Sequence, residues 1–116
     1  MASTQNVFEH HLQCFGTANL DGIMSDYSED SVLLTPTGAF KGRAAIRAFF
    51  EAGFVEFTKR GTTFNAKQSY VEGDCAFIAW DAETPDNRYE GAADTFVMRD
   101  DKIVVQTFSA KVTPKS

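Results

Sequence analysis

The segment "CAFIAWDAETPDNRYEGAADTFVMRDDKIVVQTFSAKV" (residues 75–112) decides the fold, because apolar and polar side chains alternate along much of it. Alternation with a period of two is typical of β-strands that bury one face. It predicts strands over 75–84, 89–99 and 102–112, joined by the short turns "PDN" and "DD". A further strand over 62–72 precedes them across the turn "GD". We therefore expect an antiparallel meander in the second half of the chain.

The first half of the chain follows the helical period instead. Apolar residues recur at spacings of three and four, which predicts helices over 4–18, 20–27 and 42–54. One strand over 31–38 separates the second helix from the third and ends in a turn at Pro36. Strands and helices do not alternate, so the fold class is α+β rather than α/β. A curved sheet with helices on its concave side would leave an apolar pocket inside.

The composition suits one domain, residues 1–116, with a single core. The net charge is −5, and the Lys and Arg residues are dispersed along the chain. A concentrated basic face is what nucleic acids and anionic membranes require, so we expect neither as a partner. No segment reaches the roughly eighteen apolar residues that cross a bilayer, and the N-terminus lacks the pattern of a signal peptide. A cytoplasmic location is therefore expected.

The eleven Phe residues indicate either a Phe-rich core or the wall of an apolar cavity. Cys14 and Cys75 form no CxxC motif and have no ligand spacing with the histidines. We expect both thiols to be buried, and we expect neither a metal site nor a cofactor.

His11 stands out on the first helix, because it shares the apolar stripe with Phe8 and Phe15. It is either a satisfied core histidine or a functional group. His10 is predicted to face water.

Strand alternation places Asp94 on one face with Phe96 and Met98. A carboxylate among apolar neighbours either caps a backbone donor or serves function. Trp80 is predicted to face the cavity, with a partner subunit as the alternative.

Gln106 shares a face of the last strand with Phe108. It is either a hydrogen-bond donor to a ligand or an edge residue, and the pattern does not choose. Tyr27 either offers its hydroxyl to the pocket or packs at its mouth.

"FGTANLDGIMSDYSEDSVLLTPTGAFKGRAAIRAFF" (15–50) resembles the N-terminal half of the nuclear-transport-factor-2-like superfamily, most closely its SnoaL-like and ketosteroid-isomerase-like branches. "ADTFVMRDDKIVVQTF" (93–108) is similar to the closing hairpin of that superfamily. The resemblance implies a cone-shaped, antiparallel or mixed sheet wrapped around the N-terminal helices, as in the cystatin-like α+β barrel. It implies less about activity, because the superfamily contains isomerases, dehydratases, cyclases, epoxide hydrolases and non-catalytic domains.

Ketosteroid isomerases use an Asp as general base, with a Tyr and a protonated Asp as donors to the oxyanion. The resemblance places Thr35 at the position of the base, His11 at that of the Tyr and Asp94 at that of the oxyanion Asp. A neutral hydroxyl cannot abstract the proton, so that isomerisation route is absent. His11 and Asp94 are left as a candidate catalytic pair, with Thr35 supplying a hydrogen bond.

Three functions stay open. The first is cofactor-free acid–base chemistry of the isomerase, dehydratase or hydrolase type on a small hydrophobic molecule. The second is binding of such a molecule, a metabolite or a fatty-acid-like compound, without chemistry. The third is an interaction module that dimerises.

The outer face of the sheet is predicted to have apolar character, because it carries Val97, Phe77 and Ala79. This predicts a homodimer packed sheet against sheet.

Overall fold

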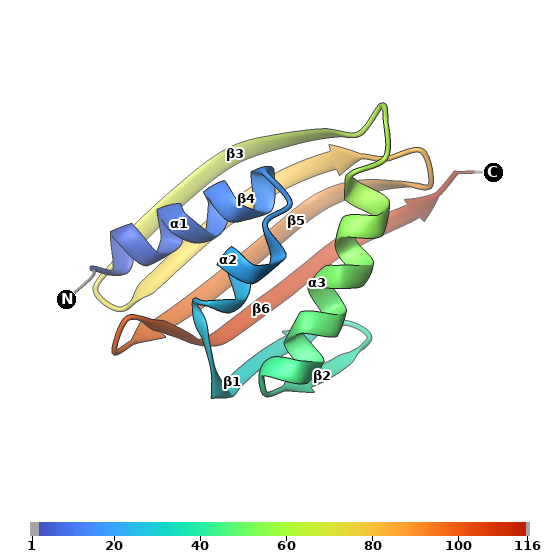
Figure 1. Ribbon diagram of the computed structural model, residues 1–116. Helices are drawn as coiled ribbons and strands as arrows, with labels where there is room; N and C mark the ends of the chain where they lie inside the picture. The colour runs from blue at the N-terminus through green and yellow to red at the C-terminus, as the bar shows by residue number, and fades with distance from the viewer. Residues whose placement is uncertain (1–2, 116) are drawn as a thin grey trace.

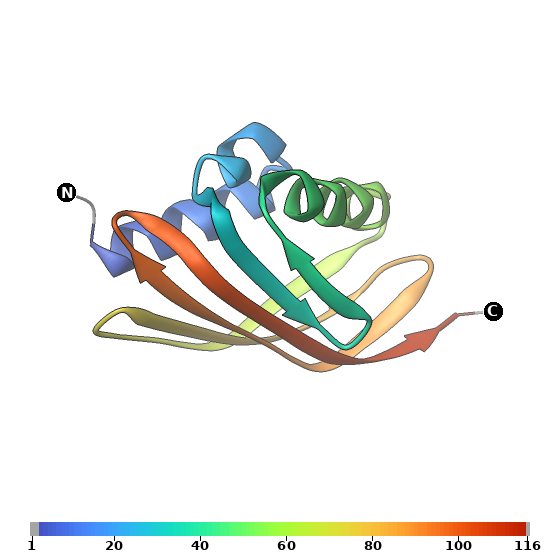
Figure 2. The ribbon, with the colours of Figure 1, turned by 90° about the horizontal axis from the view of Figure 1, so that it is seen from below.

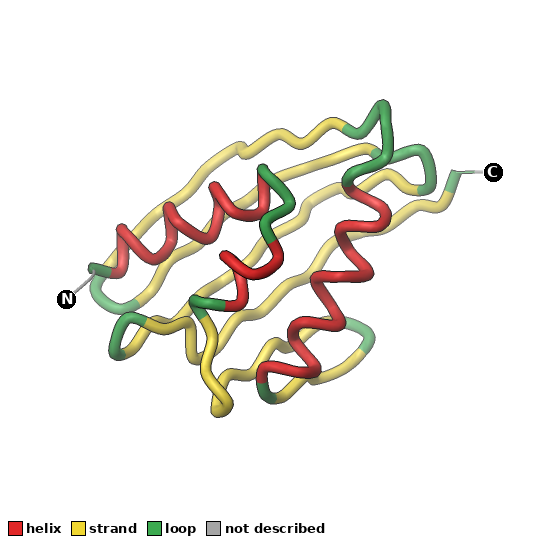
Figure 3. The backbone as a smooth tube through the Cα atoms, viewed as in Figure 1, coloured by secondary structure: helices red, strands yellow, loops and turns green. Residues whose placement is uncertain are grey.

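A computed structural model describes residues 3–115, which form a curved sheet with three helices on one face (Figures 1 and 2). Figure 3 shows the same two layers by secondary structure. The helices are α1 (Thr4–Gly16), α2 (Leu20–Met24) and α3 (Arg43–Phe57). The strands are β1 (Tyr27–Thr35), β2 (Gly38–Lys41), β3 (Thr63–Glu72), β4 (Cys75–Glu83), β5 (Asn87–Arg99) and β6 (Lys102–Pro114).

The six strands lie in the order β2-β1-β6-β5-β4-β3. Strands β3 to β6 form the predicted meander, with each neighbour antiparallel to the next. Strand β1 returns to the sheet beside β6 and runs parallel to it. The α+β class and the curved mixed sheet are thereby confirmed.

One strand was not predicted. After Thr35 the chain turns and comes back as β2, which pairs antiparallel with β1 from Val32 to Thr35. The prediction had a turn leading directly into the third helix. A strand of four residues is too short to show alternation, which is why the pattern missed it. The predicted second helix was also too long, since α2 ends at Met24 and Tyr27 already belongs to β1.

The sheet curves because its ladders are interrupted by β-bulges. The pairing shifts between Ala66 and Gln68 on β3, between Trp80 and Ala82 on β4, and again near Gly91 on β5. Gly91 has a φ of +57°, a conformation that glycine adopts without a steric cost. Bulges bend a strand and increase its twist, so the long strands wrap around α1 and α3 (Figure 2).

The core lies between the helices and the concave face of the sheet. Phe8 on α1 packs against Phe96 on β5, with ring centroids 5.5 Å apart. Ile23, Leu33 and Ile46 are fully buried and join α2, β1 and α3. Burial of this apolar surface, rather than any cross-link, holds the two layers together.

Cys14 is buried as expected, but Cys75 is exposed at the start of β4, so the prediction for that thiol was wrong. Its side chain points to the convex face, which no helix covers. No helix within residues 3–115 is long and apolar enough to cross a membrane. The cytoplasmic location stays a prediction.

Candidate functional site

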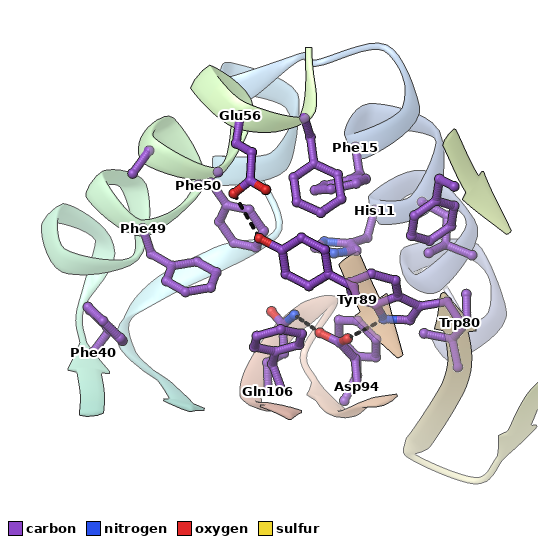
Figure 4. A pocket seen from close by; sticks show the side chains of 18 of the residues that line it. His11, Phe15, Phe40, Phe49, Phe50, Glu56, Trp80, Tyr89, Asp94 and Gln106 are labelled. Carbon is purple, nitrogen blue, oxygen red and sulfur yellow. Dashed lines mark hydrogen bonds between the residues drawn. The ribbon is translucent and has the colours of Figure 1, made fainter. Parts of the chain in front are cut away.

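A cavity of about 520 Å³ lies between α1, α3 and the concave face of the sheet. This volume falls in the range of roughly 300–1,000 Å³ that is usual for small-molecule pockets. Phe64 on β3 and Val112 on β6 line the cavity and yet are 40% and 44% exposed, so it reaches solvent on that side. Half of the residues that line it are aromatic (Figure 4): Phe15, Phe40, Phe49, Phe50, Phe57, Phe64, Phe96, Phe108, Trp80 and Tyr89.

Helix α3 leaves room for the cavity because it alternates large and small side chains on its inner face. Phe49, Phe50 and Phe57 supply bulk, whereas Ala52 and Gly53 supply almost none. A Cβ atom added at Gly53 would meet nothing within 4 Å. The hollow is therefore encoded in the helix sequence, because large side chains at every inner position would fill the space by close packing.

A buried carboxyl group forms the floor of the cavity. Asp94 on β5 is 8% exposed. The indole Nε1–H of Trp80 donates to its Oδ1 at 2.8 Å, and the amide Nε2–H of Gln106 donates to its Oδ2 at 2.8 Å. The Tyr27 hydroxyl donates in turn to Oε1 of Gln106. Four strands thus contribute one hydrogen-bonded chain, which fixes the orientation of the carboxyl group.

Burial raises the pKa of Asp94 from 3.8 to about 6, although the hydrogen bonds from Trp80 and Gln106 oppose the rise. Desolvation disfavours the charged form, whereas donors to the carboxylate favour it. The result is a carboxyl group whose pKa lies near neutral pH.

His11 on α1 lies above this floor and is 4% exposed. Its ring packs edge-on against Phe96, with centroids 5.0 Å apart, and against Phe50 at 5.7 Å. Its Nδ1 atom is buried and has no hydrogen-bond partner within the described residues. Burial, with a smaller contribution from His10, lowers the pKa of His11 to about 4, so the imidazole is neutral at pH 7.

The expected hydrogen-bonded pair of His11 and Asp94 does not form. Both residues line the cavity, but the two Asp94 oxygens are bonded to Trp80 and Gln106. The carboxylate of Asp94 therefore accepts hydrogen bonds from the Trp80 indole and the Gln106 amide, where a hydrogen bond with the His11 imidazole was expected. Four other residues that were predicted to contact a ligand do line the cavity: Trp80, Phe96, Gln106 and Phe108.

Two residues that were expected in the pocket lie outside its lining. Tyr27 is 1% exposed and packs beneath the floor, which its hydroxyl reaches only through Gln106. Thr35 lies at the turn between β1 and β2, where its hydroxyl donates to the carbonyl of Gly38 at 3.1 Å and accepts from the Thr37 N–H at 3.2 Å. The unpredicted hairpin uses this hydroxyl to close its own turn.

A second carboxyl group in the cavity was missed. Glu56 on α3 accepts hydrogen bonds from the Tyr89 hydroxyl at 2.7 Å, the Asn87 amide at 2.9 Å and the Thr84 hydroxyl at 2.6 Å. Burial and then the bond to Glu56 raise the pKa of Tyr89 well above its usual value, so the phenol keeps its proton. Figure 4 shows Glu56 across the cavity from Asp94.

A thiol, an imidazole and a carboxylate also meet at the far side of α1. His10 lies 2.8 Å from Oδ2 of Asp26 through Nδ1 and 3.4 Å from the Cys14 sulfur through Nε2. The His10 side chain is 43% exposed, so it faces water as predicted, and it also bridges two side chains. Burial raises the pKa of the Cys14 thiol, so it is protonated and a poor nucleophile. No cluster of His, Cys, Asp and Glu in the described part of the chain could hold a metal ion.

The fold has many counterparts among solved structures. An NTF2-like protein of unknown function from Mesorhizobium loti is 20% identical and has a TM-score of 0.76, covering 93% of this chain and 90% of that one. A candidate ketosteroid isomerase from Kribbella flavida is 13% identical with a TM-score of 0.76 and coverage of 97% and 81%. A candidate polyketide cyclase from Sinorhizobium meliloti is 15% identical with a TM-score of 0.73 and coverage of 88% and 92%.

At these identities the likeness shows a shared NTF2-like fold and nothing about activity. None of the curated proteins compared with the chain matches it. The sequence profile of the SnoaL-like domain matches residues 8–106, which run from within α1 to the middle of β6. The chain therefore belongs to the SnoaL-like domain family.

Proposed function

We propose that the chain binds a small, mostly apolar molecule in the cavity and moves a proton on it without a cofactor, with Asp94 as the acid–base group. One observation carries this proposal. A carboxyl group with a pKa of about 6 is held in fixed orientation at the floor of an aromatic cavity. A general base is most effective when its pKa lies near the working pH, and buried carboxyl groups of this kind are typical of functional sites.

The chemistry needs only the carboxyl group and a carbonyl-containing ligand. The Asp94 carboxylate accepts a proton from the carbon next to the carbonyl, and the C–H electron pair moves to give an enolate. The protonated acid then returns the proton to another carbon, which isomerises the ligand, or gives it to a leaving hydroxyl, which dehydrates it. The protein is unchanged at the end of either cycle.

His11 has a different role in this proposal from the one that the sequence suggested. An imidazole with a pKa of about 4 is a weak base at pH 7, but a neutral ring carries one N–H donor and one acceptor. We assign it a hydrogen bond to the ligand oxygen, where it would stabilise charge that develops on an enolate. Its partnerless ring nitrogen supports a role towards a bound molecule.

The test is hydrogen–deuterium exchange on a probe ketone. 2-Tetralone, a bicyclic apolar ketone, is incubated with the protein in D₂O, and deuterium at the carbons next to the carbonyl is followed by NMR. We expect exchange above the buffer rate, and a loss of about a hundredfold or more in Asp94→Asn. Asp81→Asn is the matched control, because Asp81 lies on β4 but outside the cavity lining. Equal exchange by the wild type and Asp94→Asn would refute the assignment of Asp94.

A second candidate is ligand binding without chemistry. The absence of a His11–Asp94 hydrogen bond favours it, because no described base other than Asp94 is positioned on the cavity floor. Binding of 2-tetralone without enhanced exchange would support this function instead.

We also propose that two copies associate through the convex sheet face, as the sequence suggested. Tyr70 on β3 is 60% exposed and stacks on Phe77 of β4 with centroids 6.3 Å apart. Val97 and Ala79 extend this apolar surface across β5 and β4. Light scattering should give the mass of a dimer at micromolar concentration and that of a monomer for Tyr70→Asp. A wild-type monomer would contradict the proposal.

A further inference from the structure

The charges around the cavity all have one sign. Asp94 and Glu56 line it, and no Lys or Arg belongs to its lining within residues 3–115. The only other ionisable groups that line it, His11 and Tyr89, are neutral at pH 7. A ligand inside therefore meets two carboxyl groups and no compensating cation.

The hydrogen-bonding groups of the cavity are equally one-sided. At its floor, the indole N–H of Trp80 and one N–H of the Gln106 amide already donate to Asp94. At the opposite side the Tyr89 hydroxyl donates to Glu56. Each carboxylate oxygen can accept two hydrogen bonds, so Asp94 retains acceptor capacity, whereas the indole of Trp80 has no second donor. The N–H groups left for a ligand are that of His11 and the second one of the Gln106 amide, and both are neutral.

The aromatic wall is compatible with positive charge. Trp80 packs near Tyr89 and Phe57, with ring centroids 5.9 Å and 6.2 Å away. Aromatic faces carry partial negative charge, so they attract cations and do not favour anions. An ammonium group between such rings and a carboxylate gains from both.

We propose that this cavity selects its ligands by charge: it accepts neutral or cationic apolar ring compounds, such as ketones, alcohols and amines, and it rejects carboxylates. The proposal rests on the ligand-binding part of the proposed function and names its ligand class. It excludes fatty acids and other anionic lipids, which an apolar pocket of this size would otherwise admit. A bound carboxylate would share the cavity with Asp94 and Glu56, and no Lys or Arg of the lining would offset the repulsion.

The test uses three matched probes at pH 7.5: naphthalene-2-methanol, naphthalen-2-ylmethylamine and naphthalene-2-carboxylate. Trp80 is the only tryptophan, so its indole N–H gives a single side-chain signal in a proton–nitrogen NMR spectrum. Because that N–H donates to Asp94, its shift reports on the cavity floor. We expect the alcohol and the amine to bind, and the carboxylate to bind about a hundredfold more weakly than the alcohol.

Two variants test whether the cavity charges cause the weaker binding of the carboxylate probe. Asp94→Asn and Glu56→Gln each remove one negative charge, and each should reduce the discrimination against the carboxylate by about tenfold. Two variants are used because either substitution disturbs a hydrogen-bond network, and a thermal unfolding curve checks that each is folded. Asp81→Asn removes the same charge outside the cavity lining and should leave the discrimination unchanged.

The outcomes separate this inference from the proposed function. Binding of all three probes with similar affinity would overturn charge selection and leave the ligand pocket standing. A carboxylate that binds more tightly than the alcohol would overturn it as well. If no probe shifts the Trp80 signal, the ligand pocket itself is refuted, and the inference falls with it.

Discussion

The buried carboxyl group of Asp94 should make the protein less stable as the pH rises through the acidic range. Its pKa is 3.8 in an unfolded chain and about 6 in the fold, so the folded state binds the proton more tightly. A group with a raised pKa contributes stability below its unfolded pKa, and this contribution is lost as the pH rises through the folded value. The difference of about two pKa units, at 1.36 kcal/mol each, corresponds to about 3 kcal/mol.

Urea denaturation of the wild type and of Asp94→Asn between pH 3.5 and pH 8 measures this contribution. The free energy of unfolding of the wild type, relative to the variant, should fall by about 2.4 kcal/mol between pH 4 and pH 7 and then level off, since part of the full difference is lost only below pH 4. His11 titrates in both proteins, and its contribution therefore largely cancels in the difference.

Asp81→Asn is the control, because the pKa of Asp81 is shifted in the opposite direction from that of Asp94. A hydrogen bond from Asn65, and a further one from Lys67, lower the pKa of Asp81, so its contribution is lost as the pH falls. If the wild type instead gains stability relative to Asp94→Asn as the pH rises, Asp94 is an ionised, paired acid. That result would refute the raised pKa on which the role of Asp94 rests.

Two further predictions concern single contacts. Trp80→Phe removes a hydrogen-bond donor that stabilises the ionised form of Asp94 by about 1.5–3 kcal/mol. The pKa of the Asp94 carboxyl group should therefore rise by one unit or more in an NMR titration of labelled Asp. An unchanged pKa would show that the indole hydrogen bond is unimportant. Gly22→Ala should lower the free energy of unfolding by about 1–3 kcal/mol, because the added Cβ would lie 2.5 Å from the nearest side-chain atom. Gly53→Ala is its control, since nothing lies within 4 Å of a Cβ there and alanine favours the helix; equal losses in both variants would contradict the steric explanation.

The fold was predictable because most of its elements are long enough to show their period. Strands β4 to β6 alternate over nine or more residues, and α1 repeats its apolar positions over three turns. Strand β2 has four residues and no such signal. The same alternation correctly placed Trp80 and Asp94 on the concave face, because burial alternates without a break along β4 and along β5 from Ala92 to Met98.

The sequence predicted a cavity residue only where the regular alternation of a strand or the period of a helix continues up to that residue. Tyr89 lies on the cavity side of β5 although it is an odd residue among even-numbered inward neighbours, because the bulge at Gly91 shifts the phase of the strand. Glu56 was missed because the third helix was predicted to end at residue 54, whereas α3 continues to Phe57. The partner of Asp94 could not be read from the sequence at all. Which donor reaches this carboxylate depends on how β4 and β6 pair with β5, because both donors lie on those strands.

The most direct test of the central claim is a crystal structure of the protein with naphthalene-2-methanol. The account predicts that the ring system occupies the cavity of about 520 Å³ and that its hydroxyl donates to Asp94. A probe bound elsewhere, or a hollow filled by the Phe side chains of α3, would contradict it.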